Sequence, residues 1–378
     1  NNNNNNINVL SPVTETKQYS VKKSAKGQRC VNDKYLMVEQ IGKGSFGSVF
    51  LAEDVKTKRQ FAMKTFARQL VFGTGGEGQG QGQRLDSQQG QQGKAQRENE
   101  HDHAGDRGEK PLEYGEIAIM KKLRHPNVVR LYEVIDDPKE KKISLVQELM
   151  GGVLMKDSLQ AEPLPLSACR KYFRDIVKGV HYLHAMGIIH RDIKPQNILL
   201  SITRESDPLT LPSAKIGDFG AAVFGLGGNR GGDRADRAGF IGTPAYTAPE
   251  LNLPREQRLQ DFSRMPCIDI FAMGATLYCM LVGRPPWMAD TELDLATKIK
   301  TMEPNLPIEA DTDPHLKHLI TRMLDKDYEA RIDMDGIVND AWVTEEGSDP
   351  LFESVYDEEE EIEGGVALER DESCVSMS

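Results

Sequence analysis

The 378-residue sequence lacks an apolar run of the roughly 18 residues that a membrane-spanning helix needs, and its polar beginning lacks the pattern of a signal peptide. Its five cysteines are an odd number and include no C-x-x-C pair, so their spacing gives no sign of a disulfide framework. We therefore expect reduced thiols in a soluble intracellular protein, cytoplasmic or nuclear, without membrane contact. Because the first residue is Asn rather than Met, we expect a fragment of a longer protein or an engineered sequence.

The sequence also lacks a dense basic patch with interleaved aromatic residues, so nucleic-acid binding is not indicated. Its formal net charge is −11, but this charge is concentrated at one end. Residues 345–378 contain 13 Asp and Glu against one Arg, which gives −12 and leaves the rest of the chain at +1. The acidity therefore describes the C-terminal tail and not the folded part.

Three segments are too polar to pack into a core. They are residues 1–33 with an asparagine run, the Gly- and Gln-rich residues 73–110, and residues 345–378. Without them 273 residues remain, which suits one domain. We predict a disordered N-terminal extension over residues 1–34, one folded domain over 35–343 and an acidic tail over 344–378.

Hydrophobic periodicity predicts an α+β fold with two lobes. Residues 35–66 alternate around a glycine cluster and predict three short antiparallel strands; residues 128–134 and 143–149 predict two more, and the spacing from Leu112 to Leu123 predicts one helix. Beyond Pro163, helices are predicted over 168–186, 269–282, 294–302 and 315–324. The expected N-lobe is a five-stranded antiparallel sheet with one helix over residues 35–150, with the insert 73–110, and the C-lobe is mainly helical over 151–343.

A glycine motif lies between the first two strands. Gly42, Gly44 and Gly47 form G-x-G-x-x-G, a pattern that is weak alone because dinucleotide-binding folds also contain it. Here the glycines join strand to strand and precede Val49, whereas the dinucleotide version would open a helix. Such a hairpin can close its backbone over phosphates.

Lys64, on the next strand, is a candidate phosphate ligand. Glu116 would hold it in place, because Glu116 shares a helix face with Leu112 and Met120, where an unpaired charge would be costly. The alternative is a Glu116 exposed on the surface.

Three further motifs follow in order and are highly specific together. They are His190-Arg191-Asp192-Ile193-Lys194-Pro195-Gln196-Asn197, then Asp218-Phe219-Gly220, which begins 26 residues after Asp192, and Ala248-Pro249-Glu250. With the glycine loop, this series resembles the protein kinase superfamily from the loop to Arg331. The resemblance implies a bilobal kinase fold, ATP and Mg²⁺ as cofactors and proteins as substrates.

The resemblance also implies roles. Asp192 would orient the substrate hydroxyl and accept its proton, Lys194 would neutralise the moving phosphate, and Asn197 and Asp218 would hold Mg²⁺. Lys194, together with Thr243, also resembles the serine/threonine class, and the Thr243 hydroxyl would bond to Asp192 and Lys194. The implied ATP contacts are Ile41, Gly42, Lys43, Gly44, Ser45, Phe46, Gly47, Ser48, Val49, Ala62, Lys64, Gln147, Glu148, Met150 and Leu199.

Other residues are expected to be structural. A lone carboxylate at Asp269, within an apolar helix, would be unfavourable without nearby donors, and the resemblance supplies the catalytic-loop backbone as its partner. Glu250 and Arg331 would likewise form a buried ion pair. Trp287 and Trp342 are expected to pack in the core.

The closer resemblance is to the calcium/calmodulin-dependent protein kinase kinases and related upstream kinases. It is carried by EIAIMKKLRHPNVVRLYEVIDDP, FRDIVKGVHYLHAMGIIHRDIKPQNILL, LITRMLDKDYEARI and AWVTEEGSDPL. It implies that the substrates are activation-loop threonines of other kinases. Calmodulin binding is not supported by this chain, because the stretch after Trp342 is acidic rather than basic and amphipathic.

Residues 221–242 contain no Ser, Thr or Tyr, so no phosphate can be added there to pair with Arg191. We hypothesise that Asp233 or Asp236 pairs with Arg191 instead; the alternative is that these charges only solvate the loop. Two other functions stay open, a general or calmodulin-dependent effector kinase and, more remotely, a pseudokinase scaffold.

Overall fold

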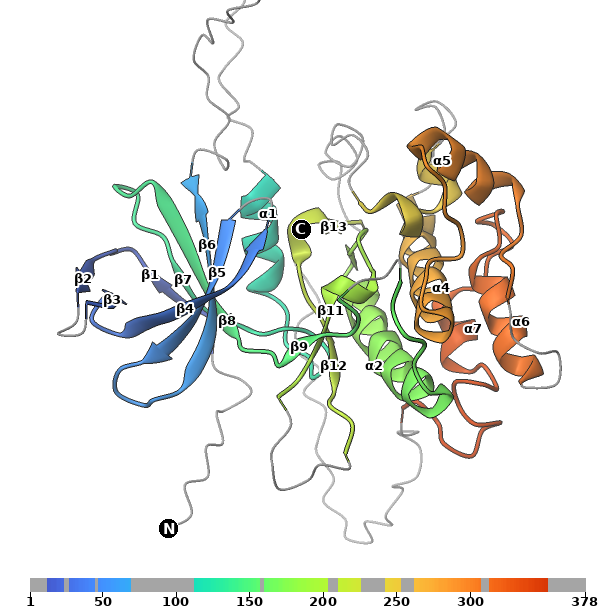
Figure 1. Ribbon diagram of the computed structural model, residues 1–378, viewed down its shortest axis with the longest axis horizontal. Coiled ribbons are helices and arrows are strands. Elements are labelled where there is room, and N and C mark those ends of the chain that lie inside the picture. Colours follow the sequence, from blue (N-terminus) through green and yellow to red (C-terminus); the bar gives the residue numbers. More distant parts are fainter. Residues whose placement is uncertain are drawn as a thin grey trace, which may run out of the picture.

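The computed structural model describes residues 12–23, 27–44, 47–68, 112–156, 160–202, 210–225, 242–252, 262–306 and 313–352. These residues form a lobe built on a sheet and a mainly helical lobe, side by side (Figure 1). The N-lobe contains the strands β1 (Thr14–Thr16), β2 (Val21–Lys23), β3 (Arg29–Val31), β4 (Tyr35–Gly44), β5 (Gly47–Asp54), β6 (Gln60–Ala67), β7 (Leu131–Ile135) and β8 (Lys142–Glu148) and the helix α1 (Leu112–Met120). The predicted α+β class with two lobes is confirmed.

The N-lobe sheet has to curl. Its strands follow the order β1-β7-β8-β6-β5-β4-β3-β2. The two edge strands, β1 and β2, are consecutive in the chain, and the four residues between them can span at most about 18 Å. A flat sheet of eight strands would hold its edges about 34 Å apart. Figure 1 shows β1, β2 and β3 gathered on the left of this lobe, as the short connection demands.

Because side chains alternate along a strand, the two faces of the curled sheet differ. On β6, Phe66 joins the same hydrophobic cluster as Ile117 of α1, whereas Met63 joins a second cluster inside the curl. The other buried members of the second cluster are Val31, Tyr35, Ala52, Phe61, Ile135 and Val146. The face with Phe66 also carries Lys64, so one face holds the candidate site and the other encloses a separate core.

The prediction of disorder over residues 1–34 is wrong for the part of this segment that the structure describes. β1 pairs in parallel with β7, and β2 and β3 form a hairpin that pairs with β4. The buried carboxylate of Glu133 on β7 links β1 to the beginning of β4, because it accepts hydrogen bonds from Thr16 Oγ1, Lys34 Nζ (2.6 Å) and Tyr35 OH (2.7 Å). The sheet thus has eight strands rather than the predicted five.

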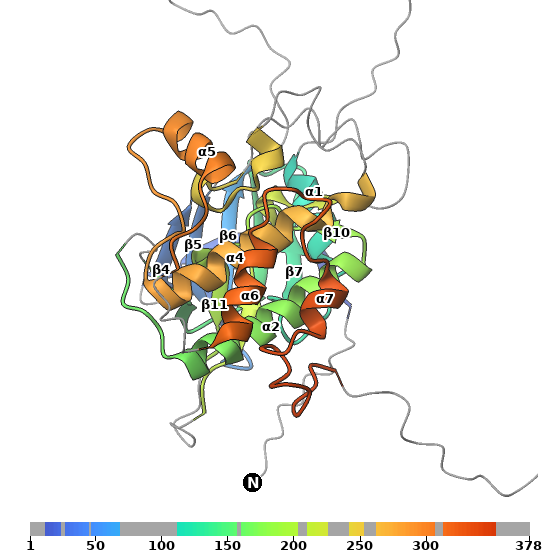
Figure 2. The ribbon, with the colours of Figure 1, turned by 90° about the vertical axis from the view of Figure 1, so that its right-hand side faces the viewer.

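The C-lobe is built around the buried helix α4 (Pro266–Val282), which packs against α2 (Leu166–Ala185) and α6 (Pro314–Met323) (Figure 2). The helices α5 (Glu292–Thr301) and α7 (Met334–Val338) complete it. The four predicted C-lobe helices agree with α2, α4, α5 and α6 within three residues at each end. None of the described helices is long and apolar enough to cross a membrane.

Five short strands beside α2 fix the positions of the loops that lie between the two lobes. They are β9 (Gly152–Val153), β10 (Ile188–Ile189), β11 (Ile198–Leu200), β12 (Ala214–Ile216) and β13 (Val223–Phe224). β10 pairs with β13, and β11 lies between β12 and β9. Gly179 lets α2 approach this region closely, because a Cβ there would lie 2.7 Å from Ile216 Cδ1 and 2.8 Å from Asn127 O.

The folded part continues beyond residue 343, where the sequence placed the start of the tail. Leu351 is buried, and Arg174 of α2 donates hydrogen bonds to the carbonyl oxygens of Val343 (2.5 Å) and Asp349 (2.8 Å). Arg174 also forms an ion pair with the Asp349 carboxylate at 3.0 Å. The acidic composition of this stretch predicted a tail, but the structure shows a turn that packs on α2.

We expect removal of residues 1–34 to lower the melting temperature by at least about 5 °C, because it exposes the core inside the curl and leaves Glu133 buried with fewer donors. Removal of residues 1–11 alone is the matched control and should change it by less than about 1 °C. Thermal unfolding followed by circular dichroism measures both. Equal melting temperatures for the two truncated proteins would contradict the structural role of β1 to β3.

One half-buried lysine of the C-lobe has its ammonium group enclosed against an aromatic ring. Lys326 Nζ lies 3.8 Å from the centroid of the Trp287 ring, and no described residue accepts a hydrogen bond from it. Burial lowers the pKa of Lys326 to about 8, with Arg331 acting in the same direction and Glu303 and Asp325 opposing it. The folded protein therefore binds this proton less tightly than the unfolded chain does.

We expect Lys326→Met to raise the melting temperature at pH 7, because below pH 8 the folded state bears the full cost of the buried ammonium. This cost fades as pH rises from about 8 toward the unfolded value of 10.5, so the gain should shrink at pH 10. Thermal unfolding at pH 7 and pH 10 tests this, with the exposed Lys317→Met as control. A gain that is the same at both pH values would refute the burial argument.

Candidate active site

The catalytic loop is anchored by one buried carboxylate. Asp269, in the first turn of α4, is fully buried and accepts hydrogen bonds from the backbone N–H groups of His190 (2.9 Å) and Arg191 (2.8 Å). Its Oδ2 also lies 2.9 Å from His184 Nε2. Burial alone would raise the pKa of Asp269, but the hydrogen bond and charge of His184, together with His190, lower it below its ordinary value. The partner expected for Asp269, the catalytic-loop backbone, is the one observed.

Sequence reasoning missed His184. It lies near the end of α2, four residues after Val180 and seven after Val177, and both valines are buried. Helical spacing therefore placed its ring on the inner face of α2, where an imidazole needs a polar partner. That signal was present, but it did not identify Asp269 as the partner.

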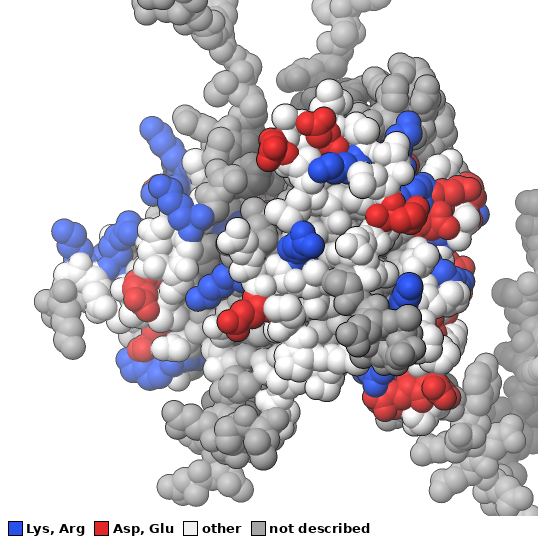
Figure 3. Space-filling view, turned by 45° about the vertical axis from the view of Figure 1, so that its right-hand side comes forward, with Lys and Arg blue, Asp and Glu red and all other residues white. Residues whose placement is uncertain are grey.

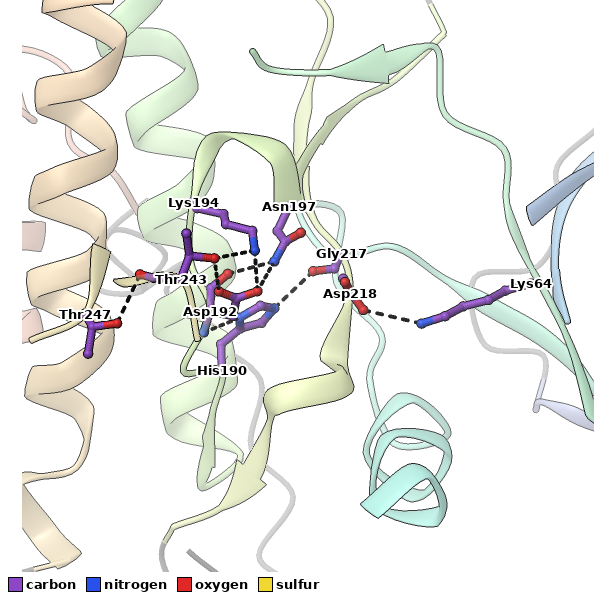
Figure 4. A network of polar contacts seen from close by, with 9 residues as sticks. All are labelled: Lys64, His190, Asp192, Lys194, Asn197, Gly217, Asp218, Thr243 and Thr247. Atoms are coloured by element: carbon purple, nitrogen blue, oxygen red, sulfur yellow. Dashed lines mark hydrogen bonds and ion pairs between the residues drawn. The ribbon is translucent and has the colours of Figure 1, made fainter. Parts of the chain in front are cut away.

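Asp192 lies at the centre of a dense polar network (Figure 4). Its Oδ2 lies 2.7 Å from Lys194 Nζ, and its Oδ1 accepts a hydrogen bond from Thr243 Oγ1 at 3.0 Å. Lys194 Nζ also lies 2.6 Å from Thr243 Oγ1. Asn197 Nδ2 donates to the backbone oxygen and to Oδ2 of Asp192, both at 2.8 Å. The structure therefore brings together the four residues that the sequence placed around the transferred phosphate.

His190 links this loop to the segment that carries Asp218. Its Nδ1 accepts a hydrogen bond from the Asp192 N–H at 3.3 Å, so its Nε2 is the donor to Gly217 O at 3.0 Å. The ring also meets Phe219 edge-on, with ring centroids 5.1 Å apart. Asp218 itself is held in the left-handed region, with φ 57°. Such a backbone costs about 1–3 kcal/mol, which the surrounding contacts offset.

Lys64 bridges the two lobes. Its Nζ lies 2.8 Å from Glu116 Oε1 of α1 and 3.3 Å from Asp218 Oδ1. Burial would lower the pKa of Lys64, but the charges of Glu116 and Asp218 raise it above its ordinary value. Partial desolvation likewise opposes ionisation of Asp218, whose side chain is half-exposed, yet Lys64 and His190 lower the pKa of that carboxyl. Both groups are therefore charged near neutral pH, as phosphate and metal binding require.

The strand register places four predicted ATP contacts on one face of the sheet. Val49 pairs with Lys64, and Ala62 pairs with Gln147. Because Ala62 and Lys64 are two residues apart, all four side chains point to the same side. The Ser48 side chain lines a cavity on the opposite face, and the predicted contact of Ser48 with ATP stays a prediction. Its backbone alone can face a nucleotide.

The glycine hairpin joins β4 to β5. Ile41 lies beside a register shift and is half-exposed, while Gly42, Lys43 and Gly44 pair with Val49, Ser48 and Gly47. Gly47 cannot be replaced without moving backbone, because a Cβ there would lie 2.2 Å from Thr65 O. The predicted contacts Ser45 and Phe46 lie outside the described residues.

The floor and the hinge come from other strands. Leu199 of β11 packs against Gly217, where an added Cβ would lie 3.0 Å from Leu199 Cδ1. The Glu148 side chain pairs with Lys215 Nζ at 2.7 Å, so its backbone rather than its carboxylate remains for a nucleotide. Met150 lies two residues after the end of β8. These positions suit the predicted contacts with the base.

Comparison with known proteins agrees with this geometry. A model of the protein kinase domain matches residues 72–343, well over half of the chain. The chain belongs to the protein kinase family. The glycine hairpin and Lys64 precede the matched range, and their place in the kinase site rests on the pairing of Lys64 with Glu116 and Asp218.

Named relatives align with nearly the whole chain. The serine/threonine-protein kinase ssp1 of Schizosaccharomyces pombe is 34% identical over 330 residues, 86% of this chain and 44% of ssp1. The calcium/calmodulin-dependent protein kinase kinase of Caenorhabditis elegans is 31% identical over 347 residues, 89% of this chain and 58% of that protein. The serine/threonine-protein kinase GRIK1 of Arabidopsis thaliana is 32% identical over 339 residues, 89% of this chain and 72% of GRIK1. The chain thus spans less than half the length of ssp1.

The kinase site offers oxygen donors that suit Mg²⁺. The amide nitrogen of Asn197 is used by Asp192, so the amide oxygen points away from that carboxylate (Figure 4). The Asp218 side chain is 55% exposed and its pKa is lowered, which leaves an ionised carboxylate facing outward. Mg²⁺ typically takes one or two such protein oxygens together with phosphate oxygens and water. Asn197 and Asp218 therefore fit the ion, which would neutralise phosphate charge when bound.

The remaining structural expectations agree with the structure. Arg331 Nη1 and Nη2 meet the Glu250 carboxylate at 2.7 and 3.0 Å, and this ion pair is buried. Trp287 and Trp342 are both buried in the C-lobe. The pairing of Asp233 or Asp236 with Arg191 lies outside the described residues and stays a hypothesis.

We expect Thr243→Val to lower kcat by about 10- to 100-fold with little change in KM for ATP, because the variant keeps the shape but loses the bonds to Asp192 and Lys194. Thr243→Ser keeps the hydroxyl and should retain most of the wild-type kcat. Steady-state phosphorylation assays measure both variants. Equal activity of the valine and serine variants would show that the hydroxyl is not needed.

Proposed function

We propose that this chain is a serine/threonine protein kinase that transfers the γ-phosphate of ATP to hydroxyl groups of other proteins. The observation that carries the proposal is Asp192 held between Lys194 and Thr243, with Asn197 fixed beside it. Lys64, Asp192 and Asp218 are all present, which argues against a scaffold that binds partners without turnover. The relatives ssp1 and GRIK1 are both named serine/threonine-protein kinases, which supports the serine/threonine class of kinase for this chain.

The residues divide the transfer between them. The substrate hydroxyl donates its proton to Asp192 while its oxygen forms a bond to the γ-phosphorus. The bond from that phosphorus to the β-phosphate oxygen breaks, and ADP leaves with the electron pair. Lys194 meets the charge on the moving phosphate, and Lys64 holds the phosphates of the departing ADP. Positioning and charge neutralisation supply the catalysis, since the side chains form no covalent intermediate.

We further propose that the substrates are activation-loop threonines of other kinases. The C. elegans relative is itself named a protein kinase kinase. The lack of Ser, Thr and Tyr in residues 221–242 supports this role, because an upstream kinase without that phosphorylation site does not need another kinase to activate it by this route. Calmodulin binding has no support in this chain, and a cytoplasmic or nuclear location stays a prediction from the sequence.

The second candidate is a general or calmodulin-dependent effector kinase. Such an enzyme would phosphorylate a generic basic peptide at least as well as a peptide with an activation-loop threonine. A pseudokinase scaffold is the remote alternative and would transfer no phosphate to either.

The decisive test is transfer of radiolabelled phosphate from Mg·ATP to an inactive AMP-activated-type kinase catalytic domain. The matched control substrate carries Thr→Ala in its activation loop, and the matched control enzyme is Asp192→Asn. We expect labelling of the intact threonine alone, with a loss of at least about 100-fold for the Asp192 variant.

The outcomes separate the proposals. Labelling of generic peptides but not of the activation loop would keep the kinase and discard the upstream role. No labelling of any protein, with wild-type enzyme that binds nucleotide, would overturn the kinase proposal itself and favour the scaffold.

A further inference from the structure

A cavity of about 330 Å³ lies inside the curl of the N-lobe sheet, on the face opposite the active site. One wall comes from the N-terminal strands, with Tyr19, Val21 and Val31. The other wall comes from the outer face of β4, β5 and β6, including Phe50 and Met63. This volume is at the small end of the range of small-molecule sites in proteins.

A row of hydroxyl groups crosses the sheet at this cavity. Ser48 of β5 pairs with Thr65 of β6, and Thr65 pairs with Ser144 of β8. Thr65 Oγ1 and Ser144 Oγ lie 3.0 Å apart, and Ser144 is buried. The residues two positions along, Phe50 and Met63, are apolar. The floor is therefore apolar with a polar stripe, unlike the purely apolar core beside it.

The charged groups at this cavity have one sign. Arg29 and Lys142 line it and are both exposed, which places their cationic ends at its mouth. No Asp or Glu is among the described residues that line it. On the β7–β8 turn, the Asp137 carboxylate already accepts hydrogen bonds from the backbone N–H groups of Tyr19 and Lys139, and Glu140 acts electrostatically on Tyr19 without lining the cavity.

The surroundings strengthen this charge. Residues 12–68 contain twelve Lys and Arg against five Asp and Glu, and Figure 3 shows Lys and Arg prevailing on the left-hand part of the described surface, where the N-lobe lies. The guanidinium of Arg29 lies 5.6 Å from the centre of the Phe50 ring, so it stays beside the apolar wall. An apolar pocket with cations at its mouth matches a ligand with an apolar body and an anionic end.

We propose that this cavity binds a small amphipathic anion, with an apolar body against Val21, Met37 and Phe50 and a carboxylate or similar group between Arg29 and Lys142. The site exists because residues 12–23 and 27–34 fold over the sheet. It is separate from the nucleotide site, because β5 and β6 lie between them.

The two sites share their strands. Ser48 and Thr65 face the cavity, whereas their neighbours Val49 and Lys64 face the active site. A ligand in the cavity therefore orders β5 and β6 before nucleotide binds. These strands then lose less conformational entropy when nucleotide binds on their other face. Ligand binding is expected to tighten nucleotide binding about two- to five-fold.

The probe for the test is 1-anilinonaphthalene-8-sulfonate, a fluorescent amphipathic anion, titrated with the ATP site saturated by a non-hydrolysable ATP analogue. We expect saturable binding with one probe per chain. Decanoate should displace it, whereas decanol, which has the same chain length without the charge, should be at least about ten-fold weaker. Equal potency of the two would overturn the need for an anion.

The matched variants are Arg29→Gln/Lys142→Gln and the control Lys56→Gln/Lys58→Gln, which removes two exposed charges from the same lobe. All four positions are exposed, so neither variant should change the melting temperature. The first pair should weaken probe binding about ten-fold, since each exposed ion pair contributes at most about 1 kcal/mol, and the control pair should change it less than two-fold. Absence of binding at the saturated enzyme, or equal binding by both variants, would refute the site.

Discussion

The active site depends on one buried carboxylate that has no role in the chemistry. Asp269 is removed from water by α4, and an uncompensated charge there would cost several kcal/mol. It is compensated by donors from two other segments, the catalytic-loop backbone and His184. Folding α4 against α2 therefore requires the loop to adopt one conformation, and that conformation includes the left-handed backbone of Arg191, with φ 65°. The strain at Arg191 is maintained because the alternative is an unpaired buried charge.

A series of hydrogen bonds that begins at Asp269 fixes the position of each reacting group. The His190 backbone is fixed by Asp269, and its ring then fixes Gly217, the residue before Asp218. Asp218 in turn lies beside Lys64, which completes the chain of contacts to the N-lobe. No single pair in this series needs to be strong. The precision comes from each group having its hydrogen-bond partners in one connected network.

Much of this arrangement could be predicted because the relevant signals are local. The C-lobe helices follow from spacing alone, and Asp269 could be predicted to need a partner because it interrupts an apolar helix. The strands β1 to β3 could not, since each has three residues and mostly exposed side chains. β1 is held by its pairing with β7 and by Glu133, which lies 117 residues after Thr16 in the sequence, and β2 and β3 are held by their pairing with each other and with β4. An isolated charged segment and a strand paired with a distant edge have the same composition, so only the tertiary partner distinguishes them.

Ser48 shows the same limit at the site itself. A motif identifies which residues lie near a phosphate, but the two-residue period of a strand decides which face each side chain takes. The motif therefore grouped Ser48 with Val49, and the register separates them. The side chains on both faces of a strand share one backbone. A contact that shifts this backbone from one face therefore also moves the side chains on the other face. The curled sheet carries the active site on one face. The side chains packed on its other face therefore help to determine the position of Lys64.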